Sequence, residues 1–264
     1  MSNMNNKVKK VLKLACLEAG KIILKNYGKK KNVKSKGNND WVTNQDILIE
    51  KKIIQIIKKT FPDSSFIGEE TGFSNASSNI TWIIDPIDGT NNYIHDYPFF
   101  CTSIGVLINN KIQYGAIYDS LRDEFFYASK KRGSYLNGKR NYLSNIKNLS
   151  DALLCPGFIT SKKSYAKNNI SNFRKLVFKA RSIRRDGSAA LDLAYVACGR
   201  FDGFWELGLN SWDTSAGVLL VEEAGGKVIN SVGRRFDILK NKSLISGNKH
   251  IVKKLLSEIK ADEI

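Results

Sequence analysis

The chain has 264 residues, of which 42% are hydrophobic, and it carries a formal net charge of +17. This length and composition support a single domain over residues 1–264 whose two closely packed halves are roughly 1–150 and 151–264. No run approaches the ~18 apolar residues of a membrane helix, and the N-terminus lacks the unbroken apolar segment of a signal peptide, so we expect no membrane partner.

The first 70 residues predict two helices and a strand. Apolar residues spaced three and four apart predict a helix over 5–27. A second helix is opened by Thr43 and ends before Phe61-Pro62-Asp63. The segment between them, KKKNVKSKGNND, is expected to be a polar loop. A short strand at Phe66–Ile67 is followed by Gly68-Glu69-Glu70.

The middle of the chain predicts an antiparallel meander. Trp82-Ile83-Ile84 is typical of a buried strand, and the polar segment from Gly89-Thr90 is interpreted as the start of a short helix. Further strands are predicted at 101–108, 112–118 and 124–129, with turns between them and another turn at 136–139.

Strands and helices alternate in the second half. Strands are predicted at 152–156, 182–185, 201–206, 227–230 and 244–245, and helices at 163–176, 188–198, 212–223 and 248–260. Mixed sheets layered with helices are the expected architecture.

Three segments deliver carboxylates to the ends of these elements. They are FIGEE (66–70), WIIDPIDGT (82–90) and SWDTSAG (211–217), and they bring Glu69, Asp85, Asp88 and Asp213. Clustered carboxylates cannot all ionise unless cations lie between them. Oxygen ligands with no His or Cys nearby favour Mg²⁺ or Mn²⁺ over zinc. Free backbone amides near Gly89 and Thr90 would face a phosphate, so the pattern indicates phosphoryl transfer.

The three segments, in this order and spacing, resemble the inositol monophosphatase family of Mg²⁺-dependent, lithium-sensitive phosphatases. The stretch GSAALDLAYVACGRFDGFWELGLNSWD (187–213) is similar to the bacterial SuhB-type branch. The resemblance covers nearly the whole chain. It implies a layered α/β/α/β/α sandwich, usually a homodimer, that hydrolyses inositol-1-phosphate and related polyol phosphates by attack of a metal-activated water.

The resemblance also implies a role for each matching residue. Two to three Mg²⁺ would bind: the first on Glu69, Asp85 and the Ile87 carbonyl, the second on Asp85, Asp88 and Asp213, and a third on Glu69 and waters. Thr90, oriented by Asp46, would help to activate the water, and the amides of Gly89 and Thr90 would bind phosphate. Asp88, Ser188, Ala189 and Glu206 would contact the polyol hydroxyls. A loop around Lys34 to Asn39 would fold over the site.

Each of these residues also has a structural interpretation. Asp85 and Asp88 could be capping aspartates in a turn, and Asp213 could complement a helix dipole. Asp46 could be a helix-start residue, Ser188 a helix cap and Glu206 a surface charge. The linked motifs favour the metal centre.

The charge and the cysteines leave further alternatives. The excess of basic residues, 42 against 25 acidic, fits either a polyanion partner or a lysine-rich compositional drift, which we favour because the lysines are spread along the chain. Cys16, Cys101, Cys155 and Cys198 form no CxxC pair, so they are expected to be mostly buried free thiols in a reducing cytoplasm.

A second function belongs to a different class. The SuhB-type resemblance implies a protein partner in ribosomal RNA transcription, alongside NusA and RNA polymerase, with or without phosphatase activity. Arg184 and Arg185 could contribute to that surface.

Overall fold

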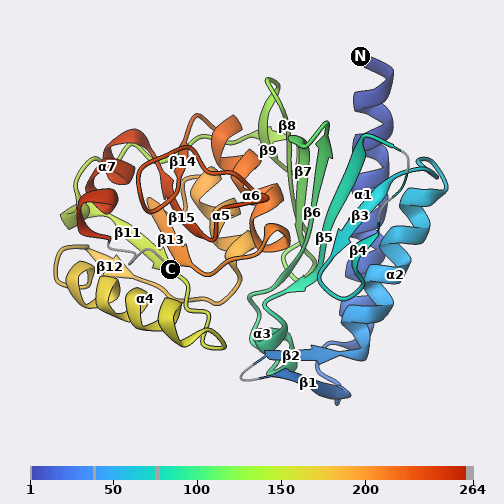
Figure 1. The fold of residues 1–264 in the computed structure, drawn as a ribbon, viewed down its shortest axis with the longest axis horizontal. Helices are drawn as coiled ribbons and strands as arrows, with labels where there is room; N and C mark the ends of the chain where they lie inside the picture. The colour runs from blue at the N-terminus through green and yellow to red at the C-terminus, as the bar shows by residue number, and fades with distance from the viewer. Residues whose placement is uncertain (1, 38–39, 75, 77, 260–264) are drawn as a thin grey trace.

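The computed structural model describes residues 2–37, 40–74, 76 and 78–259, and it has five layers (Figure 1). Helices α1 (Ser2–Asn26) and α2 (Asn44–Lys58) cover the outer face of an eight-stranded sheet. Helices α5 (Ala189–Ala197) and α6 (Ser211–Glu223) lie between this sheet and a five-stranded one. Helices α4 (Lys163–Leu176) and α7 (Lys249–Glu258) cover the far face. The layered α/β/α/β/α sandwich is confirmed.

The large sheet contains the predicted meander. Its strand order is β10-β9-β8-β7-β6-β5-β3-β4, and only β3 and β5 pair in parallel. The strands are β3 (Ser65–Gly68), β4 (Gly72–Ser74), β5 (Ile80–Asp88), β6 (Cys101–Ile108), β7 (Lys111–Asp119), β8 (Glu124–Ser129), β9 (Gly133–Leu136) and β10 (Lys139–Arg140). The short helix α3 (Thr90–Ile94) follows β5, as the sequence predicts.

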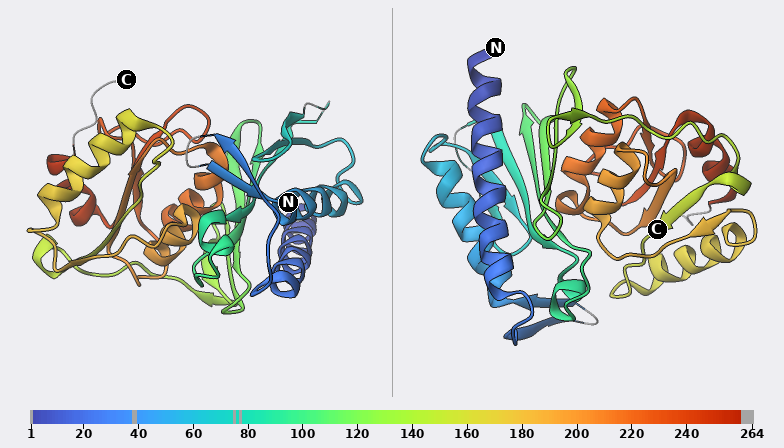
Figure 2. Two further views of the ribbon diagram at one scale, coloured as in Figure 1. Left: turned by 90° about the horizontal axis from the view of Figure 1, so that it is seen from below. Right: turned by 180° about the vertical axis from the view of Figure 1, so that it is seen from behind.

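The smaller sheet is mixed, with strand order β12-β11-β13-β15-β14 (Figure 2). Its strands are β11 (Leu153–Pro156), β12 (Ser182–Ile183), β13 (Gly203–Leu207), β14 (Lys227–Ile229) and β15 (Ser243–Gly247), and a 3-10 turn, η1 (Leu149–Asp151), precedes β11. Every strand and helix predicted for the second half is present with small shifts at the ends. Residue 260, the last of the predicted closing helix, lies outside the described residues.

The predicted polar loop before α2 is wrong in part. Strand β1 (Val33–Gly37) pairs antiparallel with β2 (Asp40–Thr43), and residues 38 and 39 lie outside the described part of the chain. All the β1 side chains are exposed, so the strand has no buried face to produce an apolar alternation in the sequence. The hairpin lies beside α3 (Figure 1).

Strand β5 is longer than predicted. It continues from Ile84 to Asp88, and its register against β6 changes between Asp85 and Asp88. Asp85 pairs with Ser103 and Asp88 with Cys101, so one strand has an extra residue there. Such a bulge changes the face to which the following side chains point, and Pro86, which has no N–H to donate, lies within it.

Three apolar clusters hold the layers together. One joins α1 and α2 to the large sheet, a second fills the space between the sheets, and a third lies beneath α4 and α7. All four cysteines are free thiols, and Cys198 alone is only half-buried. Among the described residues, no helix combines the length and apolar character needed to span a membrane. The division into one domain with two halves stays a prediction.

Candidate active site

Three aspartates from distant parts of the chain meet between the two sheets. Asp85 and Asp88 come from the bulge of β5, and Asp213 comes from the first turn of α6. One carboxylate oxygen from each lies within 4.8 Å of the others. The cluster joins the large sheet to a helix of the second half, as the sequence motifs predict.

Asp85 is the most confined of the three. Its side chain is 1% exposed, and its Oδ1 has no hydrogen-bond partner among the described residues. Burial, reinforced by the charges of Glu69, Asp88 and Asp213, raises its pKa well above the ordinary value. A buried carboxylate with an unpartnered oxygen is costly unless a cation or a proton neutralises it. Asp85 therefore marks a position that favours a cation.

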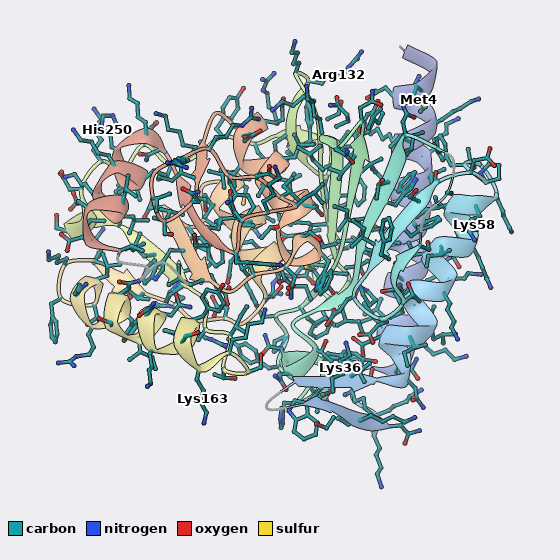
Figure 3. All side chains as sticks on the ribbon, in the orientation of Figure 1. Met4, Lys36, Lys58, Arg132, Lys163 and His250 are labelled. Carbon is teal, nitrogen blue, oxygen red and sulfur yellow. The ribbon has the colours of Figure 1, made fainter. Side chains whose placement is uncertain are left out.

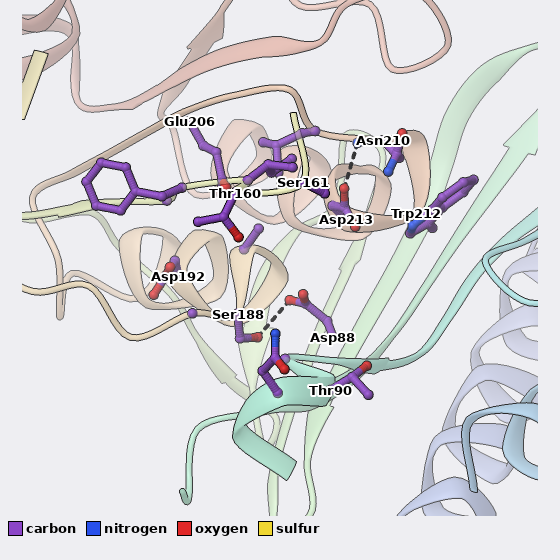
Figure 4. A pocket seen from close by; sticks show the side chains of 18 of the residues that line it. Asp88, Thr90, Thr160, Ser161, Ser188, Asp192, Glu206, Asn210, Trp212 and Asp213 are labelled. Carbon is purple, nitrogen blue, oxygen red and sulfur yellow. Dashed lines mark hydrogen bonds between the residues drawn. The ribbon is translucent and has the colours of Figure 1, made fainter. Parts of the chain in front are cut away.

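Hydrogen bonds from groups at helix starts hold Asp88 and Asp213 in place (Figure 4). Oδ2 of Asp88 accepts hydrogen bonds from the Ser188 hydroxyl at 2.7 Å and the Ala190 amide at 2.6 Å. Oδ2 of Asp213 accepts one from the Asn210 amide at 2.6 Å. Burial raises the pKa of Asp88 to about 6 and that of Asp213 to about 7. Asp213 lies in the first turn of α6, where its charge can complement the helix dipole as the structural interpretation expects, and it is also a member of the cluster.

Glu69 follows β3 directly and is ion-paired. Its carboxylate lies 3.2 Å from Nζ of Lys36 on β1, and the same ammonium lies 2.5 Å from Glu70. Burial raises the pKa of Glu69 to about 8, although the Lys36 charge opposes the shift. Residues 34–37 of the loop expected over the site belong to β1, and residues 38 and 39 lie outside the described part of the chain. No sequence signal identifies Lys36 as the residue that contacts these acids.

Thr90 and Asp46 are hydrogen-bonded to each other next to the bulge of β5. The Thr90 hydroxyl is 2.9 Å from the Ile87 carbonyl and 3.2 Å from Oδ1 of Asp46. Asp46 is fully buried, and its Oδ2 accepts from the Thr43 amide at 2.8 Å and hydroxyl at 2.5 Å. Asp46 therefore caps α2 and also positions Thr90. Because a hydroxyl has one proton, Thr90 donates to only one of its two acceptors at a time.

Gly89 makes the turn that places Thr90. Its φ of 93° is left-handed, and a Cβ at this position would lie 3.0 Å from the Phe99 carbonyl oxygen. A side chain would be strained in this conformation and would also crowd the backbone. Glycine is therefore required between the aspartate bulge and α3.

A cavity of about 250 Å³ adjoins the cluster, and Asp88, Thr90 and Asp213 line it (Figure 4). Ser188, Ala189 and Glu206 form another part of its wall. Glu206 is buried, and a Cβ at Gly157 would lie 1.8 Å from its Oε2, so the glycine makes room for the carboxylate. The sequence did not single out several further lining residues, among them Phe158, Lys162, Asp192 and Asn210, and it assigned Arg185 to a partner surface rather than to this cavity.

The aspartate cluster fits a hard divalent cation. Its members are carboxylates, the ligands that Mg²⁺ and Mn²⁺ prefer over those of zinc. Burial raises the pKa of each member, and repulsion from neighbouring carboxylates adds to the shifts of Asp85 and Asp213, which a cation would reverse. The unpartnered Oδ1 of Asp85 supplies a ligand atom that no protein group uses.

Known proteins resemble this chain over nearly its whole length. A model of the inositol monophosphatase family matches residues 4–262. The protein named Nus factor SuhB of Escherichia coli K12 is 42% identical over 253 residues, which cover 95% of this chain and 94% of that protein.

Two solved structures share the fold. The suhB protein of Bartonella henselae superposes with a TM-score of 0.93 at 37% identity, covering 97% of this chain and 100% of that one. An inositol monophosphatase from Anabaena superposes with a TM-score of 0.86 at 37% identity, covering 97% and 96%. The family match, the fold and the clustered acids agree, and the chain belongs to the inositol monophosphatase family of phosphatases.

Proposed function

We propose that this protein is a Mg²⁺-dependent phosphomonoesterase that hydrolyses inositol-1-phosphate and related polyol phosphates. The observation that carries the proposal is the aspartate cluster of Asp85, Asp88 and Asp213, in which a buried carboxylate oxygen lacks a partner. Thr90 with its partner Asp46 lies beside the cluster, and a cavity of suitable size adjoins it.

The acids would hold the metal in overlapping sets. We assign Glu69, Asp85 and the Ile87 carbonyl to a first Mg²⁺, Asp85, Asp88 and Asp213 to a second, and Glu69 to a third. Bound Mg²⁺ would supply positive charge that shields the phosphate and eases loss of a proton from the attacking water. The Lys36 ammonium is ion-paired with Glu69, so this carboxylate already has a positively charged partner in the protein.

The remaining residues would orient the reactants. When the Thr90 hydroxyl donates to Asp46, its oxygen keeps lone pairs that can accept a hydrogen bond from water. The amides of Gly89 and Thr90 would bind phosphate. Asp88, Ser188, Ala189 and Glu206 would contact the polyol hydroxyls, because they line the cavity next to the cluster.

The first experiment measures phosphate release with and without Mg²⁺. The substrates are inositol-1-phosphate, 2′-AMP, fructose-1,6-bisphosphate and 3′-phosphoadenosine-5′-phosphate. Mg²⁺-dependent release that is fastest with inositol-1-phosphate would support both the metal centre and the substrate class. No release from any of them, by a folded protein that binds Mg²⁺, would refute the enzymatic proposal.

Asp85→Asn tests the metal assignment with little disturbance of the fold. We choose Asp85 rather than Asp88 for this substitution, because the Asp88 carboxylate also accepts a hydrogen bond from the Ala190 amide at the start of α5. The variant should lose phosphate release, and without Mg²⁺ at neutral pH it should be more stable than the unaltered protein by about 1–3 kcal/mol, because it removes a buried carboxyl that can fold only by keeping its proton.

The matched control is Asp119→Asn, which changes a buried carboxylate whose partners are all in the protein. Asp119 accepts from the amides of Leu121 and Arg122 and pairs with the Arg122 guanidinium at 2.7 Å. This variant should be less stable but should still hydrolyse substrate. Full turnover by Asp85→Asn would show that the metal assignment is wrong.

A second candidate function rests on the relatives named Nus factor SuhB. We propose that this chain also binds a transcription complex containing NusA and RNA polymerase. Both arginines are exposed, but Arg185 lines the cavity and its guanidinium donates to the Phe158 carbonyl. The Arg184 guanidinium donates instead to Ser182 and Ile183 of β12.

Arg184→Glu should weaken capture by the transcription complex and leave phosphate release unchanged. The control for the change of charge alone is Arg234→Glu, which alters an exposed arginine elsewhere in the chain. Equal capture of both variants and the unaltered protein would exclude this surface. The same purified protein, measured for mass in solution, tests the homodimer that we propose from the family resemblance.

A further inference from the structure

A second group of metal-ligating side chains lies outside the aspartate cluster. It consists of Cys155 on β11, Asp186 in the segment before α5, and Asp192 on α5. One ligand atom from each lies within 4.8 Å of the others. None of the three has a role in the proposed hydrolysis, so their convergence calls for a separate explanation.

Asp192 is the residue that points to a missing ligand. It is 1% exposed, and its Oδ1 has no hydrogen-bond partner among the described residues. Burial raises its pKa well above the ordinary value, and Asp186, Glu206 and Asp88 all add repulsion. The Cys155 sulfur lies within 4.8 Å of a carboxylate oxygen of Asp192. A protonated carboxyl beside a neutral thiol would be stable, but such a pair leaves Oδ1 without a partner.

We propose that Cys155, Asp186 and Asp192 form a binding site for a thiophilic divalent cation of the Zn²⁺ class. A thiolate with two carboxylates suits Zn²⁺, whereas Mg²⁺ takes oxygen ligands alone. Zinc bonds of about 2.0–2.3 Å place ligand atoms roughly 3.5 Å apart, so the side chains need to shift by only about 1 Å. Binding releases the Cys155 proton to solvent.

The position of the site gives it a consequence for the cavity. Asp192 and Glu206 both line the cavity that contains the aspartate cluster (Figure 4). An ion on Asp192 would therefore add a divalent charge at the wall of this cavity, where it would offset the repulsion between Asp192 and Glu206. Binding itself does not depend on the proposed hydrolysis.

The test uses Co²⁺ as the probe, added to the full-length protein in an excess of Mg²⁺. Cobalt bound to a thiolate gives a near-ultraviolet charge-transfer band that carboxylate sites do not give. We expect this band to saturate at one equivalent and to disappear when Zn²⁺ is added. No band in the unaltered protein would overturn the proposal, and a water molecule would then be the better partner for Asp192.

Four variants identify the ligands. Cys155→Ser should abolish the band, while Cys198→Ser should keep it. Cys101→Ser should also keep it, and it is the critical control because the Cys101 thiol lies 4.0 Å from Oδ2 of Asp88. Asp186→Asn alters a half-buried residue and should weaken Co²⁺ binding by at least about tenfold in a protein that still folds. A band that survives in Cys155→Ser, or unchanged affinity in Asp186→Asn, would refute the site.

Discussion

At the scale of single residues, the acids of the candidate site all favour protons. Burial raises the pKa of Asp88 to about 6, Asp213 to about 7 and Glu69 to about 8. Repulsion from neighbouring carboxylates adds to the pKa shifts of Glu69 and Asp213. A protein without metal therefore keeps protons at neutral pH that an unfolded chain would release, and each Mg²⁺ that binds must displace them.

This difference predicts how stability depends on pH. Unfolded carboxyls titrate near pH 4, so between about pH 4 and pH 8 the folded, metal-free protein binds more protons than the unfolded chain. Its free energy of unfolding should then fall as pH rises through that range. Mg²⁺ binds the ionised form, so it should remove the fall. Thermal unfolding with a chelator or with Mg²⁺, from pH 5 to 8, checks this, with about 2–4 °C expected per kcal/mol.

The contrary outcome of this unfolding experiment is also defined. If the metal-free protein keeps its melting temperature or gains stability between pH 5 and pH 8, the acids are not protonated as their burial implies. The Asp85→Asn variant should show a shallower dependence than the unaltered protein, because it removes a group whose pKa is raised in the fold. The Asp119→Asn variant keeps the whole cluster and should show the full dependence.

The sequence could predict part of the residue-level picture. Asp85, Asp88 and Asp213 follow recognisable apolar runs, so their place at element ends and their convergence were predictable. The contacts of Lys36 with Glu69 and of Cys155 with Asp192 were not. Each pair joins segments that are distant along the chain, and the pairing depends on how strands and helices pack rather than on any local pattern.

At the scale of elements, apolar periodicity was sufficient wherever an element has a buried face. It predicted the meander β6–β8 and the helices α4 to α7. It failed for the β1–β2 hairpin, whose first strand is wholly exposed. That hairpin lies at the candidate site, since its Lys36 forms ion pairs with Glu69 and Glu70. An element without a core face gives no periodic signal, although backbone pairing still forms it.

Lys36→Met tests what the hairpin does to metal binding. The Lys36 ammonium competes with a cation for Glu69 and repels a cation nearby. Unit charges about 4 Å apart in water interact by about 1 kcal/mol, so the variant should reach half-maximal activity at roughly one-fifth of the Mg²⁺ concentration. Lys34→Met changes an exposed lysine on the same strand and should have no effect. If Lys36→Met needs as much Mg²⁺ as the unaltered protein for half-maximal activity, or more, Lys36 does not compete with the metal.

At the scale of the whole molecule, α6 connects the two sheets. It packs against β6, β7 and β8 and carries Asp213 in its first turn. Two strand glycines allow this close packing: a Cβ at Gly105 would lie 2.3 Å from the Ser215 hydroxyl, and one at Gly115 would lie 2.9 Å from the Ala216 backbone. The geometry of the metal centre is therefore set by the distance between a helix of one half and a sheet of the other.

The surface charge is distributed over the same molecule. Lys58, Arg132 and Lys163 lie at separate edges (Figure 3), so at least part of the net charge of +17 is spread over the surface. The candidate active site, by contrast, is formed by acids, which attract cations in spite of the basic surroundings.

Gly115→Ala tests whether the distance between α6 and the sheet controls metal binding. The added methyl meets the backbone of α6, which cannot rotate away, so α6 and Asp213 must move. We expect a loss of about 1–3 kcal/mol of stability and weaker Mg²⁺ binding, measured by titration of activity and of the melting temperature.

Gly20→Ala in α1 is the control. Its methyl would lie 2.5 Å from the ring of Tyr118, which is on the same strand as Gly115 but packs against α1. It should cost stability without changing Mg²⁺ affinity. If both variants lose stability and neither loses Mg²⁺ affinity, the aspartate cluster tolerates displacement of α6, and its geometry is set by the bulge of β5 alone.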